Sequence, residues 1–151
     1  LWARPCRMRG IGDTLGPVPD LPPVHFVLVN PGVEVATPAV FKALTDTSGA
    51  SMPDDLPDWK STGDLAGWLK SQRNDLELPA RLIAPAIGVA LARLQQTDGC
   101  LLARMSGSGA TCFGLYATRT EAEDAAAARR EVQGGWWVTA ASSWRIDSAA
   151  V

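Results

Sequence analysis

The residues best suited to chemistry in this sequence form one short stretch rich in glycine and hydroxyl groups. It reads Met105-Ser106-Gly107-Ser108-Gly109-Ala110-Thr111. Two glycines so close together let successive backbone N–H groups turn toward a common point, which creates a concavity for an anion. The three hydroxyls add donors without adding charge. Residues 106–111, here called the glycine loop, are therefore a candidate phosphate-binding loop.

A plain tight turn would use the same residue types, because glycine also satisfies the backbone geometry of a hairpin connection. The stretch has no Gly-Lys-Ser/Thr sequence, so it is not a Walker loop. A strand is expected after it, whereas a dinucleotide-binding fingerprint opens a helix. Spacing alone leaves phosphate binding and a simple turn equally open.

Strands are expected on both sides of the glycine loop, over residues 101–105 and 112–116. The apolar run His25–Asn30, bounded by prolines, predicts a buried central strand. Residues 136–141 predict the last strand, with Trp136 and Trp137 on opposite faces. Residues 1–12 predict a short strand and a turn, and the proline-rich residues 13–23 an irregular connector.

Helices are predicted between these strands. Thr37-Pro38 can open the first, with Thr37 as its cap, and Pro85 starts a stronger one. A further helix is expected over residues 64–72, after a variable loop at 46–63. Thr120 and Glu123 form a capping box for the last helix. The order of elements predicts an α+β fold, an antiparallel sheet with helices on one face, in a ferredoxin-like arrangement.

The composition excludes several classes of function. Hydrophobic residues make up 46% of the 151 positions and the net charge is only −2, which gives no electrostatic footprint for nucleic acid. We expect neither a membrane span nor a signal peptide. Three widely spaced cysteines and one histidine, His25, predict reduced, buried thiols in the cytoplasm and no metal site. Because the chain begins at Leu1 within structured-looking sequence, we expect a fragment of a longer protein.

Four stretches, taken in order, resemble the GHMP small-molecule kinases. The stretch from Arg104 to Gly114 is similar to the third motif of that family, in the wording of a branch whose acceptor carries cytosine. The second is Gly-Ile-Gly-Asp at residues 10–13. The third, residues 29–41, contains Asn-Pro-Gly-Val followed by Thr37 and Phe41. The fourth is Asn-Asp-Leu-Glu at residues 74–77. Together they cover the chain from about residue 9 to about residue 140.

The resemblance implies a two-domain enzyme that uses ATP and Mg²⁺ to phosphorylate an alcohol on a small-molecule substrate. In this family the base aspartate, the catalytic lysine and the nucleotide loop belong to an N-terminal domain. We expect that domain to precede this chain and to be its partner. Residues 1–24 would form the domain junction and residues 25–151 the C-terminal domain, inactive alone and holding no catalytic residue of its own.

The resemblance also implies that the glycine loop, residues 106–111, binds phosphate, and it implies substrate contacts for two further residues. Thr37 matches a threonine whose hydroxyl lies beside the acceptor, and Phe41 matches an aromatic that stacks on cytosine. From the residues alone, Thr37 could simply cap a helix and Phe41 could pack in the core beside Val40 and Leu44.

The remaining polar residues of these motifs have plainer interpretations. Asn74 and Asp75 are expected to brace backbone near the glycine loop. Arg104 either adds positive potential beside that loop or lies on an exposed face. The rival functions are another GHMP kinase, such as a homoserine or mevalonate kinase, and a stand-alone α+β binding domain.

Overall fold

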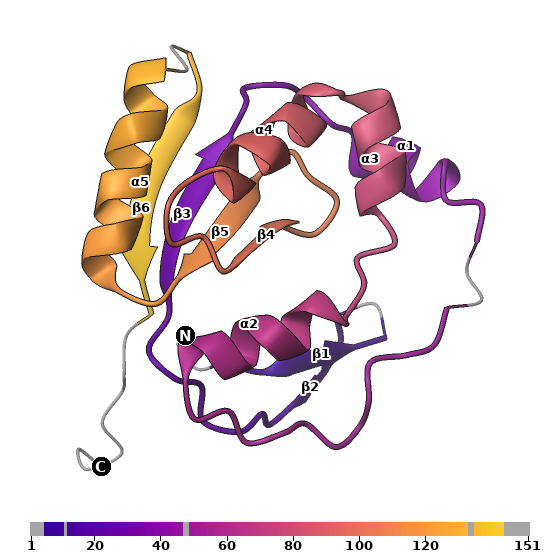
Figure 1. The fold of residues 1–151 in the computed structure, drawn as a ribbon. Helices are drawn as coiled ribbons and strands as arrows, with labels where there is room; N and C mark the ends of the chain where they lie inside the picture. Colours follow the sequence, from indigo (N-terminus) through magenta and orange to yellow (C-terminus); the bar gives the residue numbers. More distant parts are fainter. Residues whose placement is uncertain (1–4, 11, 47–48, 133–134, 144–151) are drawn as a thin grey trace.

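A four-stranded antiparallel sheet forms the centre of the protein (Figure 1). The computed structural model describes residues 5–10, 12–46, 49–132 and 135–143. The strands lie in the order β4-β5-β3-β6. Their bounds are β3 His25–Asn30, β4 Leu102–Met105, β5 Cys112–Tyr116 and β6 Trp137–Ser142. This order, with every neighbouring pair antiparallel, is that of a ferredoxin-like sheet, so the predicted fold class is confirmed.

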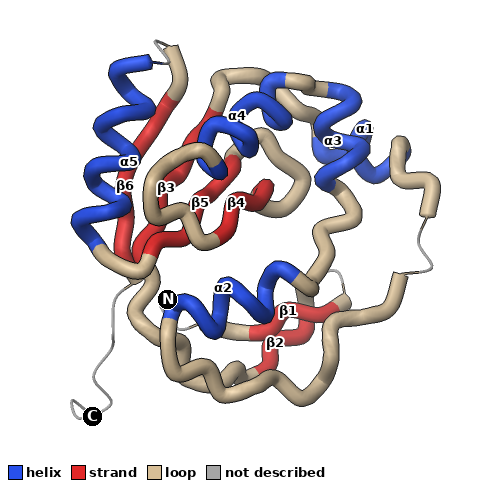
Figure 2. The backbone as a smooth tube through the Cα atoms, in the orientation of Figure 1, coloured by secondary structure: helices blue, strands red, loops and turns tan. Residues whose placement is uncertain are grey.

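Two long helices cover one face of the sheet. They are α4 (Ala86–Gln95) and α5 (Arg119–Val132), which Figure 2 shows in blue beside the red strands. Alternate residues of β3 and β5 point toward them, as the pleat requires, and Val27, Val29 and Cys112 are almost wholly buried there. The short helices α1 (Thr37–Lys42) and α3 (Glu77–Ile83) contact each other beside α4.

The opposite face of the sheet packs against α2 (Thr62–Lys70). Trp59 and Trp68 meet edge to face there, with ring centroids 5.1 Å apart. Below α2 lies a hairpin of β1 (Arg7–Arg9) and β2 (Thr14–Gly16), and an apolar pocket of about 880 Å³ lies between the hairpin, α2 and the sheet. The expected helical layer is thus present, and α2 adds cover to the second face.

Several local predictions need correction. The connector at 13–23 contains the strand β2, and α3 was not predicted. The capping box of α5 uses Thr118 and Glu121, two positions before the predicted pair: the Thr118 N–H donates to Glu121 Oε2 over 2.9 Å. Trp137 is exposed and Trp136 packs on the core, as the alternation predicted.

Of the cysteines, Cys112 is buried but Cys6 is exposed, contrary to expectation.

Within the part of the chain that the structure describes, no helix is both long and apolar enough to cross a bilayer.

Candidate functional site

The glycine loop joins β4 to β5 and is closed by two internal hydrogen bonds. The Ser106 N–H donates to the Thr111 carbonyl over 2.9 Å, and the Gly109 N–H donates to the Ser106 carbonyl over 3.0 Å. The amides of Gly107, Ser108, Ala110 and Thr111 donate to no protein acceptor among the described residues. The loop is therefore a tight turn that leaves four amides without a protein acceptor among the described residues.

The two glycines of the loop have positive φ angles for different reasons. At Gly109, with φ of 96°, an added Cβ would lie 3.1 Å from both Ile87 Cδ1 and Met105 Sδ. At Gly107, with φ of 56°, an added Cβ would meet nothing within 4 Å. Gly109 therefore lets the loop pack closely on α4, whereas Gly107 lies in open space where a ligand could approach its backbone.

Side chains that precede and begin α3 hold the first half of the loop. Asn74 Nδ2 donates to the Met105 carbonyl over 3.1 Å and to the Gly107 carbonyl over 2.9 Å. The Met105 N–H donates to Glu77 Oε2 over 3.4 Å. The bracing role predicted for Asn74 is thus observed.

Asp75, which was expected to help, instead pairs with Arg73 over 2.7 Å. The hydrogen bond and positive charge of Arg73 hold the pKa of that carboxyl below its usual range. This ion pair is exposed and lies beside the loop contacts rather than among them, so the prediction for Asp75 is wrong.

A second asparagine, at the end of β3, holds the other half of the loop. Asn30 Nδ2 donates to Thr111 Oγ1 over 3.0 Å, and Asn30 Oδ1 accepts from the Gly32 N–H over 2.9 Å. Asn30 was not predicted to be a functional residue. Its one signal was an amide side chain at the end of a buried strand, directly before Pro31-Gly32.

Thr37 lies directly against the glycine loop. Its Oγ1 is 2.8 Å from Ser108 Oγ, so the two hydroxyls share a hydrogen bond. The prediction that Thr37 caps α1 is wrong, because Ala36 occupies the cap position and no side chain caps this helix. The hydroxyl of Thr37 is therefore engaged by the loop rather than by the helix.

Phe41 is 56% exposed, whereas its neighbour Val40 is fully buried. Core packing of Phe41 is therefore excluded. Residues four apart lie on the same side of a helix, so Phe41 projects from the face of α1 that also carries Thr37. The same face of α1 thus carries an exposed aromatic ring and a hydroxyl that contacts the glycine loop.

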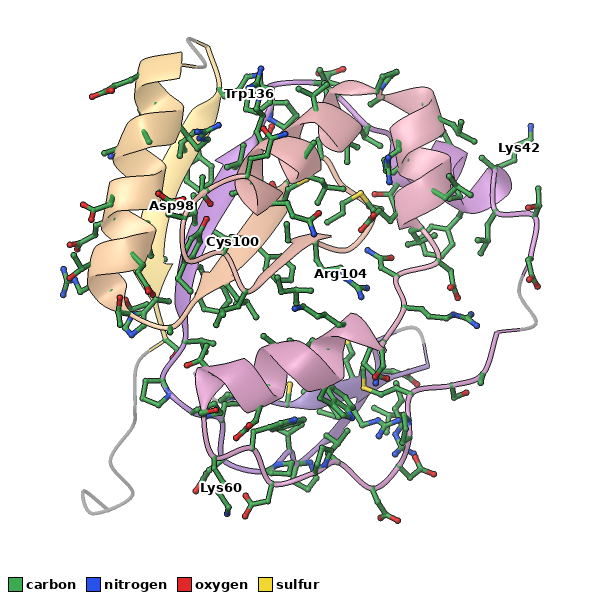
Figure 3. All side chains as sticks on the ribbon, viewed as in Figure 1. Lys42, Lys60, Asp98, Cys100, Arg104 and Trp136 are labelled. Atoms are coloured by element: carbon green, nitrogen blue, oxygen red, sulfur yellow. The ribbon has the colours of Figure 1, made fainter. Side chains whose placement is uncertain are left out.

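Two other polar residues lie away from this group. Arg104 donates through Nη2 to the Leu69 and Lys70 carbonyls at 3.1 and 3.2 Å, and Figure 3 shows it extending from β4 toward α2. It thus ties the C-terminal end of α2 to the sheet. His25 Nδ1 lies 2.8 Å from Ser142 Oγ at the other end of β3.

No group of three or more His, Cys, Asp or Glu side chains able to hold a metal ion occurs among the described residues.

Comparison with known proteins places this geometry in a family. The family model "GHMP kinases C terminal" matches residues 52–133. A 4-diphosphocytidyl-2-C-methyl-D-erythritol kinase from Dinoroseobacter shibae is 52% identical over 91% of this chain and 48% of its own length. The enzyme of the same name from Paracoccus denitrificans is 51% identical over 93% of this chain and 51% of its own length. The chain thus spans about half the length of the curated relatives it matches.

Solved structures show the same likeness. A crystal structure of 4-(cytidine 5'-diphospho)-2C-methyl-D-erythritol kinase is 30% identical, with a TM-score of 0.66, over 93% of this chain and 50% of that one. A homoserine kinase from Cytophaga hutchinsonii, 16% identical with a TM-score of 0.57, shares the fold. Since the family model covers more than half of the chain, the protein belongs to the GHMP kinases, and this chain corresponds to their C-terminal region.

Proposed function

We propose that the full-length protein carrying this chain transfers the γ-phosphate of ATP to the 2-hydroxyl of 4-diphosphocytidyl-2-C-methyl-D-erythritol. The names of relatives at about half identity support this substrate. The reaction belongs to the non-mevalonate route to isoprenoids, in the bacterial cytoplasm. Within the proposal, residues 1–24 are the domain junction and residues 25–151 the C-terminal domain. An N-terminal domain supplies the base aspartate, the lysine and the nucleotide loop.

The observation that carries the proposal is the hydroxyl pair of Thr37 and Ser108. It brings a segment suited to an acceptor alcohol against a loop whose free amides suit a phosphate. Phosphoryl transfer depends mainly on alignment and on stabilising charge at the transferring group, and fixed N–H donors do both. When bound, Mg²⁺ neutralises phosphate charge.

Each proposed site residue has a separate part in this reaction. The free amides of Gly107, Ser108, Ala110 and Thr111 bind phosphate oxygens, with the hydroxyls of Ser106, Ser108 and Thr111 as further donors. Thr37 orients the acceptor hydroxyl. Phe41 stacks on the cytosine ring, and its exposure favours this acceptor over homoserine or mevalonate, which have no base to stack.

The test compares the full-length protein with this chain alone. Each is incubated with ATP, Mg²⁺ and the cytidine-containing acceptor, and ³¹P NMR follows the new phosphomonoester. We expect phosphorylation by the full-length protein and none by the chain alone. Homoserine and mevalonate serve as competing acceptors. Turnover of either of these in preference to the cytidine compound would contradict the proposed substrate, and turnover by this chain alone would contradict the division of labour.

A further inference from the structure

Asn74 makes more contacts with the glycine loop than an ordinary turn residue requires. Its Oδ1 accepts from the Leu76 N–H over 3.2 Å, which is a common local use of an asparagine before a helix. Its Nδ2 group reaches across 31 and 33 residues to the carbonyls of Met105 and Gly107. Both N–H donors of the Asn74 amide and its carbonyl oxygen are therefore hydrogen-bonded to protein, and the two donors hold the backbone at the glycine loop.

Anchoring a carbonyl also sets the direction of an amide. The Gly107–Ser108 peptide is trans, so its C=O and N–H groups point in opposite directions within one plane. When the Gly107 carbonyl faces Asn74, the Ser108 N–H must face the other side of the loop. That amide is one of the four without a protein acceptor among the described residues.

The next peptide toward the N-terminus behaves in the same way. The Ser106 carbonyl accepts the Gly109 N–H inside the turn, so the Gly107 N–H, in the same peptide plane, points outward. The positive φ of 56° at Gly107 joins these two planes. The outward amides of Gly107 and Ser108 are consecutive, and consecutive N–H groups of this kind form an anion-binding nest.

We propose that Asn74 is a positioning residue for phosphate binding: by holding the Met105 and Gly107 carbonyls, it turns the Ser108 N–H toward the anion. The proposal rests on the phosphate-binding function proposed above. Asn74 acts through the loop backbone and touches no reacting atom. Its amide NH₂ carries the function, whereas its Oδ1 serves the local turn.

An aspartate at this position separates the two roles of the side chain. Asn74→Asp keeps the oxygen that accepts from Leu76 and nearly the same shape, but places a carboxylate oxygen against two carbonyls. Because no bond can form while the group is ionised, the pKa of the new carboxyl should be raised. Once protonated, it regains one donor for the loop. The variant should therefore recover function as the pH falls, which a merely structural loss would not do.

The experiment uses the ¹⁵N-labelled full-length protein with pyrophosphate as the anion probe. Amide shifts of the loop are followed at about pH 8 and about pH 6 in the wild type, Asn74→Asp and Asn74→Ala. The matched control is Asp75→Asn, the reverse substitution at the neighbouring residue, whose side chain forms an exposed ion pair with Arg73. Kinase activity on the proposed acceptor is measured in parallel, and thermal unfolding reports stability.

We expect pyrophosphate to shift the Gly107 and Ser108 amides most strongly in the wild type and in Asp75→Asn. In Asn74→Asp, affinity for pyrophosphate and kcat/KM should fall roughly ten- to a hundred-fold at the higher pH and recover partly at the lower. In Asn74→Ala, pyrophosphate affinity and kcat/KM should fall at both pH values. The inference would be overturned if pyrophosphate did not shift the Ser108 amide of the wild type. It would also be overturned if Asn74→Asp had the pyrophosphate affinity and kcat/KM of the wild type at both pH values. If pyrophosphate binds as expected but the acceptor is never phosphorylated, the proposed substrate fails and the positioning role stands.

Discussion

The hydroxyl groups of Thr37 and Ser108 lie 2.8 Å apart although 71 residues separate them in the chain. Thr37 opens the short helix α1, and Ser108 lies in the middle of the glycine loop. The contact therefore joins the segment proposed to hold the acceptor to the segment proposed to hold phosphate. A small displacement of either side should be felt in catalysis more than in folding, because alignment is what such a reaction needs.

Thr37→Val and Ser108→Ala should each lower kcat of the full-length enzyme by about ten- to a hundred-fold, since each removes the shared hydrogen bond. The kcat of the double variant should be only slightly lower than that of the slower single variant, because both changes break the same contact. Steady-state kinetics of the four proteins measures this coupling. Thr120→Val, at an exposed position on α5, is the control and should match the wild type. Losses that simply multiply would show that the two hydroxyls act independently.

Phe41→Ala should raise the KM for the cytidine-containing acceptor by roughly five- to a hundred-fold, because base stacking on an aromatic ring contributes about 1–3 kcal/mol. Its free energy of unfolding should change by less than about 1 kcal/mol, because the side chain is 56% exposed. Initial-rate kinetics and urea unfolding give the two values. Leu82→Ala, an apolar side chain 76% exposed on α3, controls for the loss of surface area. A large loss of stability with unchanged KM would assign Phe41 to packing.

Gly109→Ala should destabilise the protein by about 2 kcal/mol or more, and Gly107→Ala by about 1 kcal/mol. Both have positive φ, but only at Gly109 would the new methyl group press on Ile87 and Met105, each 3.1 Å away. Urea unfolding measures the difference. Gly67 lies in the middle of α2, and a Cβ added there would meet no atom within 4 Å. Gly67→Ala should therefore stabilise the protein slightly, because alanine has the higher helix propensity. Equal costs at the two loop glycines would contradict the close packing on α4.

The free energy of unfolding should fall as the pH rises above about 9, in part because of Cys112. Burial, with a smaller contribution from the negative charge of Glu77, raises the pKa of this thiol from 9.0 to about 12. Above pH 9 the unfolded chain ionises the thiol while the native state keeps its proton. Stability is therefore fully present below pH 9 and decreases toward pH 12, by about 1.4 kcal/mol per pH unit for one thiol.

Cys112→Ala should be less stable than the wild type near neutral pH but should show a shallower decline above pH 9. Urea unfolding at a series of pH values gives the slopes. Leu115→Ala is a core truncation on the opposite face of the sheet and removes no titrating group, so it should lower stability and leave the slope unchanged. Identical slopes in Cys112→Ala and the wild type would contradict the proposed linkage.

Strong local signals made much of the sheet predictable from the sequence. The strand Cys112–Tyr116 was predicted with its observed bounds, because it lies between a glycine-rich turn and a polar helix start. The apolar run at His25–Asn30 identified the central strand for the same kind of reason. By contrast, α3 carries the exposed residues Leu78 and Leu82 and a proline in its first turn. Its apolar pattern therefore lacks the buried stripe by which a helix is recognised.

The site was less predictable than the fold, because its supporting contacts are distant in sequence. The glycine loop could be found by composition, but Asn74 lies 31 to 33 residues before its acceptors and Asn30 lies 81 residues before Thr111. Nothing local says which carbonyl or hydroxyl an asparagine will reach. Thr37 shows the converse case: a Thr-Pro pair suggested a cap, whereas tertiary contact with Ser108 took the hydroxyl instead.

The position of β3 between β5 and β6 has a consequence for motion. Both edges of this strand are paired over its length, and it runs directly into Asn30 and the segment leading to Thr37. A shift of β3 itself would break ladder bonds on two sides. We therefore expect this strand to be among the last parts of the domain to open, so that Asn30 keeps its position while substrates enter and leave.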